Sequence, residues 1–281
     1  MTEGGASIGT ASQEGHNLLL RIIASIVMAP LAIAIAYVGG WLWTGLVTLA
    51  AIGLYLEWLA VVGTSNRLLV VLGTLVLLGA GWVEAAHFGV GSISAVVALG
   101  IVIAAIFSRD RRGWTVLGIG YAFAALIASC MVRRDPASGF AALMLVLLAV
   151  WAADIGGYFA GRLIGGPKLW PQVSPKKTWA GAAGGFLASL AVAAGFAAFD
   201  VGKAVPLLFL AGGLSVASQL GDLFESAIKR KFGVKDSSQI IPGHCGLMDR
   251  LDGFVAAVVV AAIFGFLRGG ADGVGHGLMV W

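Results

Sequence analysis

The chain has 281 residues, of which 59% are hydrophobic and only 11% charged, and its mean hydropathy is +0.95. This balance excludes an ordinary soluble globular domain. The net charge of +4 does not indicate nucleic-acid binding, because the apolar majority leaves no room for a continuous basic surface; anionic lipid headgroups or phosphate substrates fit the charge better.

Nine apolar segments are long enough to cross a bilayer. A hydrocarbon core of about 30 Å needs roughly 20 apolar residues per helix. Backbone groups in lipid must be hydrogen-bonded within the protein, so these runs without period-2 alternation predict helices rather than barrel strands. The segments are residues 18–38, 41–62, 68–86, 90–107, 114–132, 140–161, 179–199, 204–224 and 253–267. The predicted fold class is all-α: a polytopic helical membrane protein with about nine transmembrane helices.

The N-terminal part carries few side chains that suggest chemistry. Residues 1–17 contain no Lys or Arg, so they lack the basic region of a secretory signal, and we expect the first apolar segment to remain as a helix. Beyond Glu57 and Glu84, residues 18–135 offer little, and we interpret them as a scaffold that faces lipid. The abundant Gly, 42 residues, suits closely packed membrane helices, although simple tolerance of Gly in lipid explains it about as well.

The distribution of Lys and Arg predicts the orientation. With nine helices, thirteen of the 18 basic residues fall on the side of the N-terminus. Because cytoplasmic loops retain positive charge during insertion, we expect residues 1–17 to form a cytoplasmic tail. Nine of the thirteen lie in two connections, at about 162–178 and 225–252. We therefore interpret residues 136–281 as a catalytic region whose loops face the cytoplasm at the inner (plasma) membrane.

Two acidic pairs flank the second connection. Asp222 and Glu225 share a face at the end of the eighth segment, and Asp249 and Asp252 share one at the start of the ninth. If the helix ends meet, up to four carboxylates converge, and these are the hard ligands that Mg²⁺ takes together with waters and substrate phosphates. An acid beside an apolar run is costly, which favours a metal role for Asp222. Helix N-capping is the alternative for Asp249 and Asp252.

A basic stretch and a tight turn separate the acidic pairs. Lys229, Arg230 and Lys235 precede a turn with the sequence Pro-Gly-His-Cys-Gly, which contains His244. The basic stretch alone fits a positive-inside anchor. The turn favours binding, because Gly lets the backbone approach a ligand closely and a His near the membrane surface offers a donor to phosphate. The two cysteines, Cys130 and Cys245, lie in unlike settings without a CxxC pair, so we expect neither a disulfide nor zinc.

The first connection joins glycines, hydroxyls and paired lysines. It contains Ser174, Lys176, Lys177 and Thr178 after a Gly-rich stretch. Such a backbone with Lys can hold a polyphosphate, but the spacing is not that of a P-loop. Asp154, about two turns inside the sixth segment, is expected to be a buried acid that faces a polar cavity or pairs structurally with an Arg or with helix backbone.

Taken together, these motifs resemble a known family. They comprise Asp154 with Tyr158, Gly161 and Arg162; Ser174-Pro-Lys-Lys-Thr178; Gly221-Asp222-Leu-Phe-Glu225-Ser226; Ser226-Ala-Ile-Lys229-Arg230; Lys235-Asp236; His244-Cys245-Gly246; and Asp249-Arg250-Leu-Asp252. Their order resembles the phosphatidate cytidylyltransferase (CDP-diacylglycerol synthase) family over about residues 150–253. The chain departs from the family pattern at Cys245, where a Gly is usual, and at Ala180, where a Glu is usual.

The resemblance implies an Mg²⁺-dependent transfer of the cytidylyl group of CTP to phosphatidate, which gives CDP-diacylglycerol and pyrophosphate. On this hypothesis Asp222 and Asp249 hold the metal, with Glu225 and Asp252 in support. The partners are CTP, phosphatidate and membrane lipids, and a homodimer is compatible with the sequence. The residues expected to bind CTP or the lipid phosphate are Ser174, Lys176, Lys177, Thr178, Lys229, Arg230, Lys235, His244 and Arg250, with Asp154 lining the cavity.

Three other functions compete with this one. A transporter or channel would use intramembrane acids such as Glu57, Glu84 and Asp154, but no inverted repeat is evident. A CTP-dependent kinase of another lipid, such as a polyprenol, is the nearer alternative, and the complete C-terminal signature argues against it. A purely structural membrane scaffold explains the basic loops but not the acids placed beside them.

Overall fold

A computed structural model describes residues 28–108, 111–235, 237 and 246–281. Within these residues, eight helices are long and apolar enough to cross a membrane, and they correspond to the second to ninth predicted segments. They are α2 (Gly40–Val62), α3 (Arg67–Ala85), α4 (Gly89–Phe107), α5 (Arg112–Arg134), α6 (Gly139–Leu163), α7 (Trp179–Ala198), α8 (Ala204–Lys231) and α9 (Met248–Gly269). The predicted fold of a polytopic helical membrane protein is thereby confirmed. A shorter apolar helix, Met28–Val38, precedes them, and the beginning of the first predicted segment lies outside the described residues.

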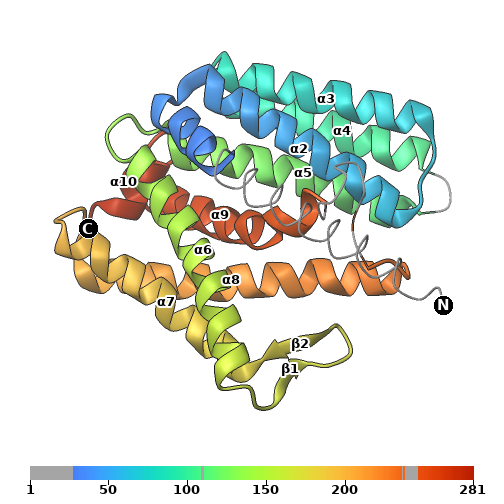
Figure 1. Ribbon diagram of the computed structural model, residues 1–281. Helices are drawn as coiled ribbons and strands as arrows, with labels where there is room; N and C mark the ends of the chain where they lie inside the picture. The colour runs from blue at the N-terminus through green and yellow to red at the C-terminus, as the bar shows by residue number, and fades with distance from the viewer. Residues whose placement is uncertain (1–27, 109–110, 236, 238–245) are drawn as a thin grey trace, which may run out of the picture.

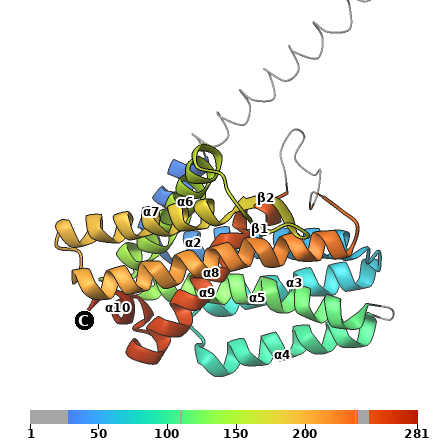
Figure 2. The ribbon, with the colours of Figure 1, turned by 90° about the horizontal axis from the view of Figure 1, so that it is seen from below.

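The helices gather into two groups. Figure 1 shows α2, α3, α4 and α5 on one side, with α9 beside α5 and α8 beside α9. Helices α6 and α7 cross this group at an angle and pack on each other (Figure 1), and the view from below in Figure 2 shows α7 beside α8. A last short helix, α10 (Val274–Met279), follows the predicted segments and packs on α9.

Two boundaries differ from the sequence-based expectation. Helix α8 continues to Lys231, whereas its apolar segment ends near residue 224, and α9 begins at Met248 rather than near residue 253. A hydropathy window ends where charges begin, but a helix can continue past the hydrocarbon. Three basic residues in the last turn of α8 favour that continuation, because cations are stabilising near the negative end of the helix dipole. The connection between these helices is therefore shorter than residues 225–252.

The first predicted loop contains a hairpin. Strands β1 (Lys168–Trp170) and β2 (Ser174–Thr178) pair in antiparallel register, with Lys168 opposite Thr178 and Trp170 opposite Ser174. The hairpin lies beside α8 and the beginning of α7. It therefore brings Lys177 to the side of α8 rather than leaving it in an irregular loop.

Small residues explain how closely α6 and α7 pack. A Cβ atom at Gly184 would lie 2.2 Å from Cβ of Ala160, and one at Gly185 would lie 2.6 Å from the carbonyl oxygen of Ala153. Real side chains do not fit at such distances, so at these positions glycine allows the backbones to approach, as in other membrane helix pairs. Of the two explanations for the abundant Gly, close packing applies to this helix pair.

Helix α2 is fixed by its polar aromatic side chains. The hydroxyl of Tyr55 donates a hydrogen bond to the carbonyl oxygen of Leu69 at 3.1 Å, and Nε1 of Trp58 donates to that of Trp114 at 2.8 Å. Both rings are buried. Buried Tyr and Trp combine a large apolar contact with one polar bond, so they join α2 firmly to α3 and α5.

Candidate active site

The hairpin places one lysine against α8. Lys177 on β2 forms an ion pair with Asp222, and the hydroxyl of Ser226, one turn further along α8, lies 3.5 Å from Oδ1 of the same acid. The neighbouring Thr178 is buried and caps α7, since its Oγ1 accepts a hydrogen bond from the backbone N–H of Gly181 at 3.0 Å. This cap holds the end of β2 and thereby the position of Lys177.

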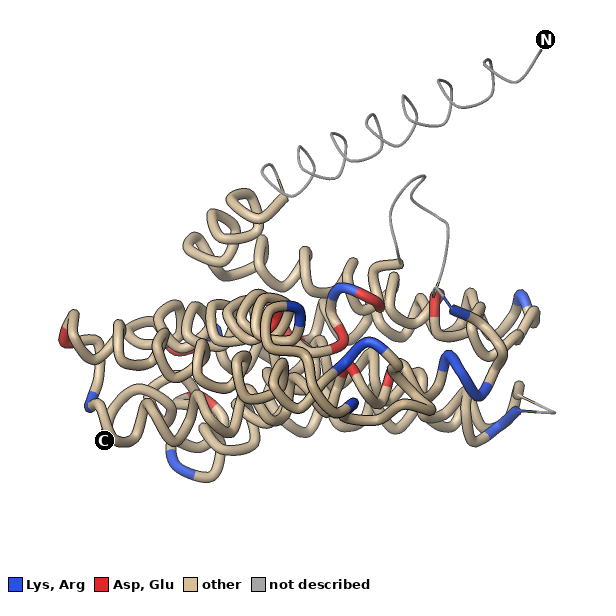
Figure 3. The backbone as a smooth tube through the Cα atoms, turned by 60° about the horizontal axis from the view of Figure 1, so that its bottom comes forward, with Lys and Arg blue, Asp and Glu red and all other residues tan. Residues whose placement is uncertain are grey.

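The ends of α8 and α9 meet, as the two acidic pairs led us to expect. Lys229 on α8 lies between acids of both helices: its Nζ is 3.2 Å from Oε1 of Glu225 and forms an ion pair with Oδ1 of Asp249. Figure 3 shows acidic and basic positions gathered near the middle of the molecule among long uncharged helices. We call Asp222, Glu225, Asp249, Asp252, Lys177 and Lys229 the carboxylate–lysine cluster.

Glu225 is the most enclosed member of this cluster. Its side chain is 2% exposed, and its partner in the described part of the chain is the ammonium of Lys229, 3.2 Å from Oε1, which leaves the geometry of a full hydrogen bond unmet at both oxygens. Asp252 lies beside it, so the ammonium of Lys229 neutralises only part of the local negative charge. A buried carboxylate whose charge is only partly compensated is costly in free energy, and a further cation would relieve that cost. Carboxylate oxygens of this kind are the donors that a hard divalent ion takes.

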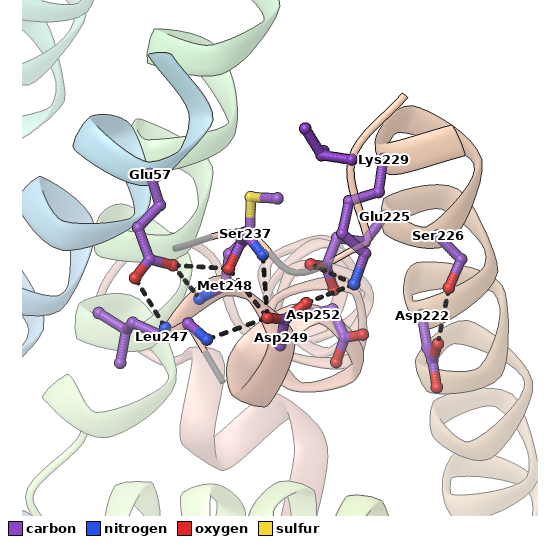
Figure 4. A network of polar contacts seen from close by, with 12 residues as sticks. Glu57, Asp222, Glu225, Ser226, Lys229, Ser237, Leu247, Met248, Asp249 and Asp252 are labelled. Carbon is purple, nitrogen blue, oxygen red and sulfur yellow. Dashed lines mark hydrogen bonds and ion pairs between the residues drawn. The ribbon is translucent and has the colours of Figure 1, made fainter. Parts of the chain in front are cut away.

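Asp249 is held by several donors. Its Oδ2 accepts hydrogen bonds from the backbone N–H of Ser237 at 3.2 Å, from the Ser237 hydroxyl at 3.0 Å and from the N–H of Gly246 at 3.0 Å. Lys229 contacts the other oxygen (Figure 4). With both oxygens engaged, the carboxylate has a fixed orientation toward α8.

The N-capping alternative for the two aspartates of α9 is not what the structure shows. Leu247, at the N-cap position, makes no side-chain cap. The N–H groups of Leu247 and Met248 donate instead to Glu57 on α2. Asp252 accepts from the N–H of Gly253, its own neighbour, at 2.7 Å.

The expectation for Asp154 is partly wrong. It lies close enough to Asp222, Asp252 and Lys177 to interact with them electrostatically, so α6 does contribute an acid to this region. Its side chain is exposed rather than buried. The reason is that the buried residues of α6 all precede Asp154, because the helix crosses its neighbours at an angle and leaves its C-terminal half less covered.

The remaining predicted site residues that the structure describes form no ion pair with the cluster. Four basic side chains are exposed and form no ion pair with any other residue that the structure describes; they are Lys176, Arg230, Lys235 and Arg250. Ser174 is half-buried at the start of β2. His244 and Cys245 lie outside the described residues.

No three His, Cys, Asp or Glu side chains in the described ranges are grouped tightly enough to hold a metal ion as they stand. The acids of the cluster are instead interleaved with Lys177 and Lys229.

Sequence reasoning missed two participants. Glu57 was noted only as an acid in the scaffold, and Ser237 was not considered; both contact the network around Asp249. The signal for Glu57 was its charge within an apolar segment, which is a default sign of function. The partner of that charge is 190 residues away in the sequence, so no local pattern indicates it.

A helical membrane fold with a charged cluster, where two helix ends meet a β-hairpin, fits an integral membrane enzyme that handles phosphorylated substrates. The chain belongs to the cytidylyltransferase family, whose model matches residues 19–267. This confirms the family indicated by the sequence motifs.

Three relatives that match more than half of the chain are all phosphatidate cytidylyltransferases. A phosphatidate cytidylyltransferase of Brucella suis is 38% identical over 261 residues, which is 89% of this chain and 93% of the relative. One of Haemophilus influenzae is 40% identical over 209 residues, covering 67% and 73%. One of Bacillus subtilis is 36% identical over 160 residues, covering 55% and 58%.

Proposed function

We propose that this membrane cytidylyltransferase acts on phosphatidate, and that the carboxylate–lysine cluster is its active site. The products are CDP-diacylglycerol, a precursor for phospholipid synthesis, and pyrophosphate. The observation that carries the site assignment is the position of Lys229, which joins Glu225 and Asp249 where α8 meets α9. The match to phosphatidate cytidylyltransferases over 89% of the chain supports the substrate.

The reaction requires little acid–base chemistry from the protein. The phosphomonoester of phosphatidate is already an anionic nucleophile near neutral pH. One of its oxygens forms a bond to the α-phosphorus of CTP, while the bond between that phosphorus and the bridging oxygen to the β-phosphate breaks and pyrophosphate leaves. Positioning of the two phosphates and neutralisation of their charge therefore supply most of the catalysis.

The acids are proposed to hold Mg²⁺. Asp222 and Asp249 would be ligands, with Glu225 and Asp252 as further ligands or as acceptors for its waters. These are hard oxygen donors from two helix ends that lie together, and the buried carboxylate of Glu225, which shares the single ammonium of Lys229 with Asp249, supports a cation there. When bound, Mg²⁺ neutralises developing charge on the phosphates and orients them.

The basic residues are proposed to hold the phosphates. The four exposed side chains, Lys176, Arg230, Lys235 and Arg250, would contact CTP or the lipid phosphate. Lys177 and Lys229 would keep the acids neutralised before substrates arrive. Ser174 and His244 would donate hydrogen bonds to nucleotide or phosphate. Thr178 already accepts one from Gly181, so its part would be to donate its hydroxyl hydrogen.

The proposed location serves both substrates. A charged site at helix ends can receive CTP from water and phosphatidate from the bilayer. The positive-inside pattern of the sequence supports a cytoplasmic site at the plasma membrane. Asp154 would line the side of this site nearest to α6. A homodimer stays a prediction.

The reaction itself is the first measurement. Purified protein in detergent is incubated with CTP, phosphatidate and Mg²⁺, with and without a chelator, and CDP-diacylglycerol and pyrophosphate are quantified. Equal amounts of both products, lost with the chelator, are expected. Formation of CDP with a polyprenol in place of phosphatidate would instead indicate a lipid kinase, and no product with either lipid would contradict the assignment.

Asp249→Asn tests the metal role. The substitution keeps the shape of the side chain but removes its charge, so we expect normal membrane insertion and a loss of Mg²⁺-dependent turnover of about a hundredfold or more, the scale for removing a preorganised electrostatic group. Asp272→Asn is the control, because that carboxylate is 92% exposed and its ion pair is with Arg134. Unchanged turnover in Asp249→Asn would reject this residue as a ligand.

A further inference from the structure

The scaffold helix α2 reaches into the active site through one acid. Glu57 is only 4% exposed. Its Oε1 accepts a hydrogen bond from the backbone N–H of Leu247 at 2.9 Å, and its Oε2 accepts one from the N–H of Met248 at 2.7 Å. These residues begin α9, on which Asp249 stands one position further on.

This arrangement is an N-terminal cap supplied by another helix. The first N–H groups of a helix have no partner within it and form the positive end of its dipole. Side chains at N-caps are usually local Ser, Thr, Asp or Asn, but Leu247 makes no side-chain cap. Glu57 provides the acceptor and the negative charge instead, so the start of α9 is fixed to α2.

The same carboxylate is connected to Asp249 through Ser237. The hydroxyl of Ser237 lies 3.1 Å from Oε2 of Glu57 and 3.0 Å from Oδ2 of Asp249. Its single hydrogen is therefore shared between the two acids. Figure 4 shows the continuous line of contacts from Glu57 through Ser237 and Asp249 to Lys229.

The surroundings leave little freedom for another arrangement. A Cβ atom at Gly246 would lie 1.8 Å from Oγ of Ser237 and 2.7 Å from Oε2 of Glu57. One at Gly53, a turn earlier on α2, would lie 2.6 Å from Cδ2 of Leu247. Packing this close transmits the position of α2 to the beginning of α9.

We propose that Glu57 is a positioning residue of the active site: by holding the first N–H groups of α9 and the hydroxyl of Ser237, it sets the orientation of Asp249 toward the metal and the phosphates. The inference rests on the metal role proposed for Asp249. It also gives the N-terminal helices a part in shaping the active site, through Asp249. Removing a group that hydrogen-bonds to a metal ligand and orients it typically lowers metal affinity or activity by about tenfold to a hundredfold.

Glu57→Gln is the test. The amide keeps one acceptor but turns its NH₂ group toward a backbone or hydroxyl donor, so one bond is lost and a repulsive contact is created. We expect the Mg²⁺ concentration for half-maximal turnover to rise about tenfold or more, with the KM for phosphatidate within about twofold of the wild type. The rise in the unfolding midpoint on adding Mg²⁺ without substrates should shrink in parallel, because weaker binding stabilises less.

Glu84→Gln is the matched control. Glu84 is also a buried acid of the N-terminal helices, but it pairs with Arg134 rather than with α9. Its loss should lower the unfolding midpoint without changing the Mg²⁺ dependence. A Glu57→Gln protein with wild-type Mg²⁺ dependence in both measurements, whatever its overall activity, overturns the proposal.

Two further variants complete the design. If Glu57→Gln does not fold, Ser237→Ala removes the connection while leaving the cap, and a Mg²⁺ dependence shifted in the same direction is expected; an unshifted one overturns the proposal. Asp249→Asn separates this inference from its premise. If Asp249→Asn is inactive while Glu57→Gln is normal, only the positioning role fails. If Asp249→Asn is normal, the metal role of Asp249 fails, and the positioning role with it.

Discussion

Lys229 is a residue of this site that serves both the stability of the fold and the proposed chemistry. Its side chain is 12% exposed, and its ammonium lies between Glu225 and Asp249, whose side chains are 2% and 11% exposed. In so enclosed a position, the pairing of charges is a condition for folding as well as for chemistry, because an acid left alone there would be poorly solvated.

Lys229→Met should therefore destabilise the protein while keeping the apolar bulk. Breaking a buried ion pair by removing one partner costs about 3–5 kcal/mol, since the other charge is left without compensation. We expect a lower unfolding midpoint in detergent, together with loss of turnover. Lys176→Met is the control in the hairpin, where the lysine is exposed and its removal should leave the midpoint unchanged. Equal midpoints for both variants would contradict the structural role of Lys229.

At the scale of elements, the sequence predicts the helices well and the hairpin not at all. Hydropathy identifies α2 to α9, because lipid demands long apolar runs. Strand β2 reads Ser-Pro-Lys-Lys-Thr, and Pro and Lys are depleted in strands, so propensity gives no hint of it. The ion pair between Lys177 and Asp222 depends on that hairpin, so it could not be predicted from the sequence either.

The α6–α7 pair offers a test at this scale. Gly184→Ala would place a methyl group 2.2 Å from Cβ of Ala160 and push the helices apart, which we expect to cost about 1–3 kcal/mol and to lower turnover by moving the hairpin. Gly195→Ala, on the same helix, meets open space and should be neutral or slightly stabilising in the helix interior. Unfolding midpoints and turnover of the two variants check this. Similar midpoints for both would show that the α6–α7 contact is not limiting.

At the scale of the whole molecule, the sequence predicts an N-terminal scaffold up to residue 135 and a catalytic region from residue 136. In the structure these two parts are less separate than the composition suggests. The C-terminal part does carry the acids and most of the basic residues, as the motifs indicated. Yet α9 packs on α5, and its first N–H groups are bound by Glu57 of α2. Such long-range contacts leave no trace in local patterns, which is why residues 18–135 were interpreted as scaffold alone.

The distribution of basic residues along the whole chain predicts its orientation in the membrane. Lys176 and Lys203 are both exposed, and with an odd number of spans between them they face opposite sides of the bilayer. Because basic residues concentrate on the side of Lys176, we expect that side to be cytoplasmic. Single cysteines at these positions, in a chain with both native cysteines replaced by serine, report the orientation through a membrane-impermeant maleimide.

Lys203→Cys should react in intact spheroplasts, whereas Lys176→Cys should react only in inverted vesicles. The reverse pattern would place the carboxylate–lysine cluster on the side away from cytoplasmic CTP and would contradict the proposed site. Labelling of both positions after detergent is added is the control for accessibility. Protection of Lys176→Cys by CTP and Mg²⁺ in inverted vesicles would further support a nucleotide beside the hairpin, because a bound polyphosphate would cover this exposed position.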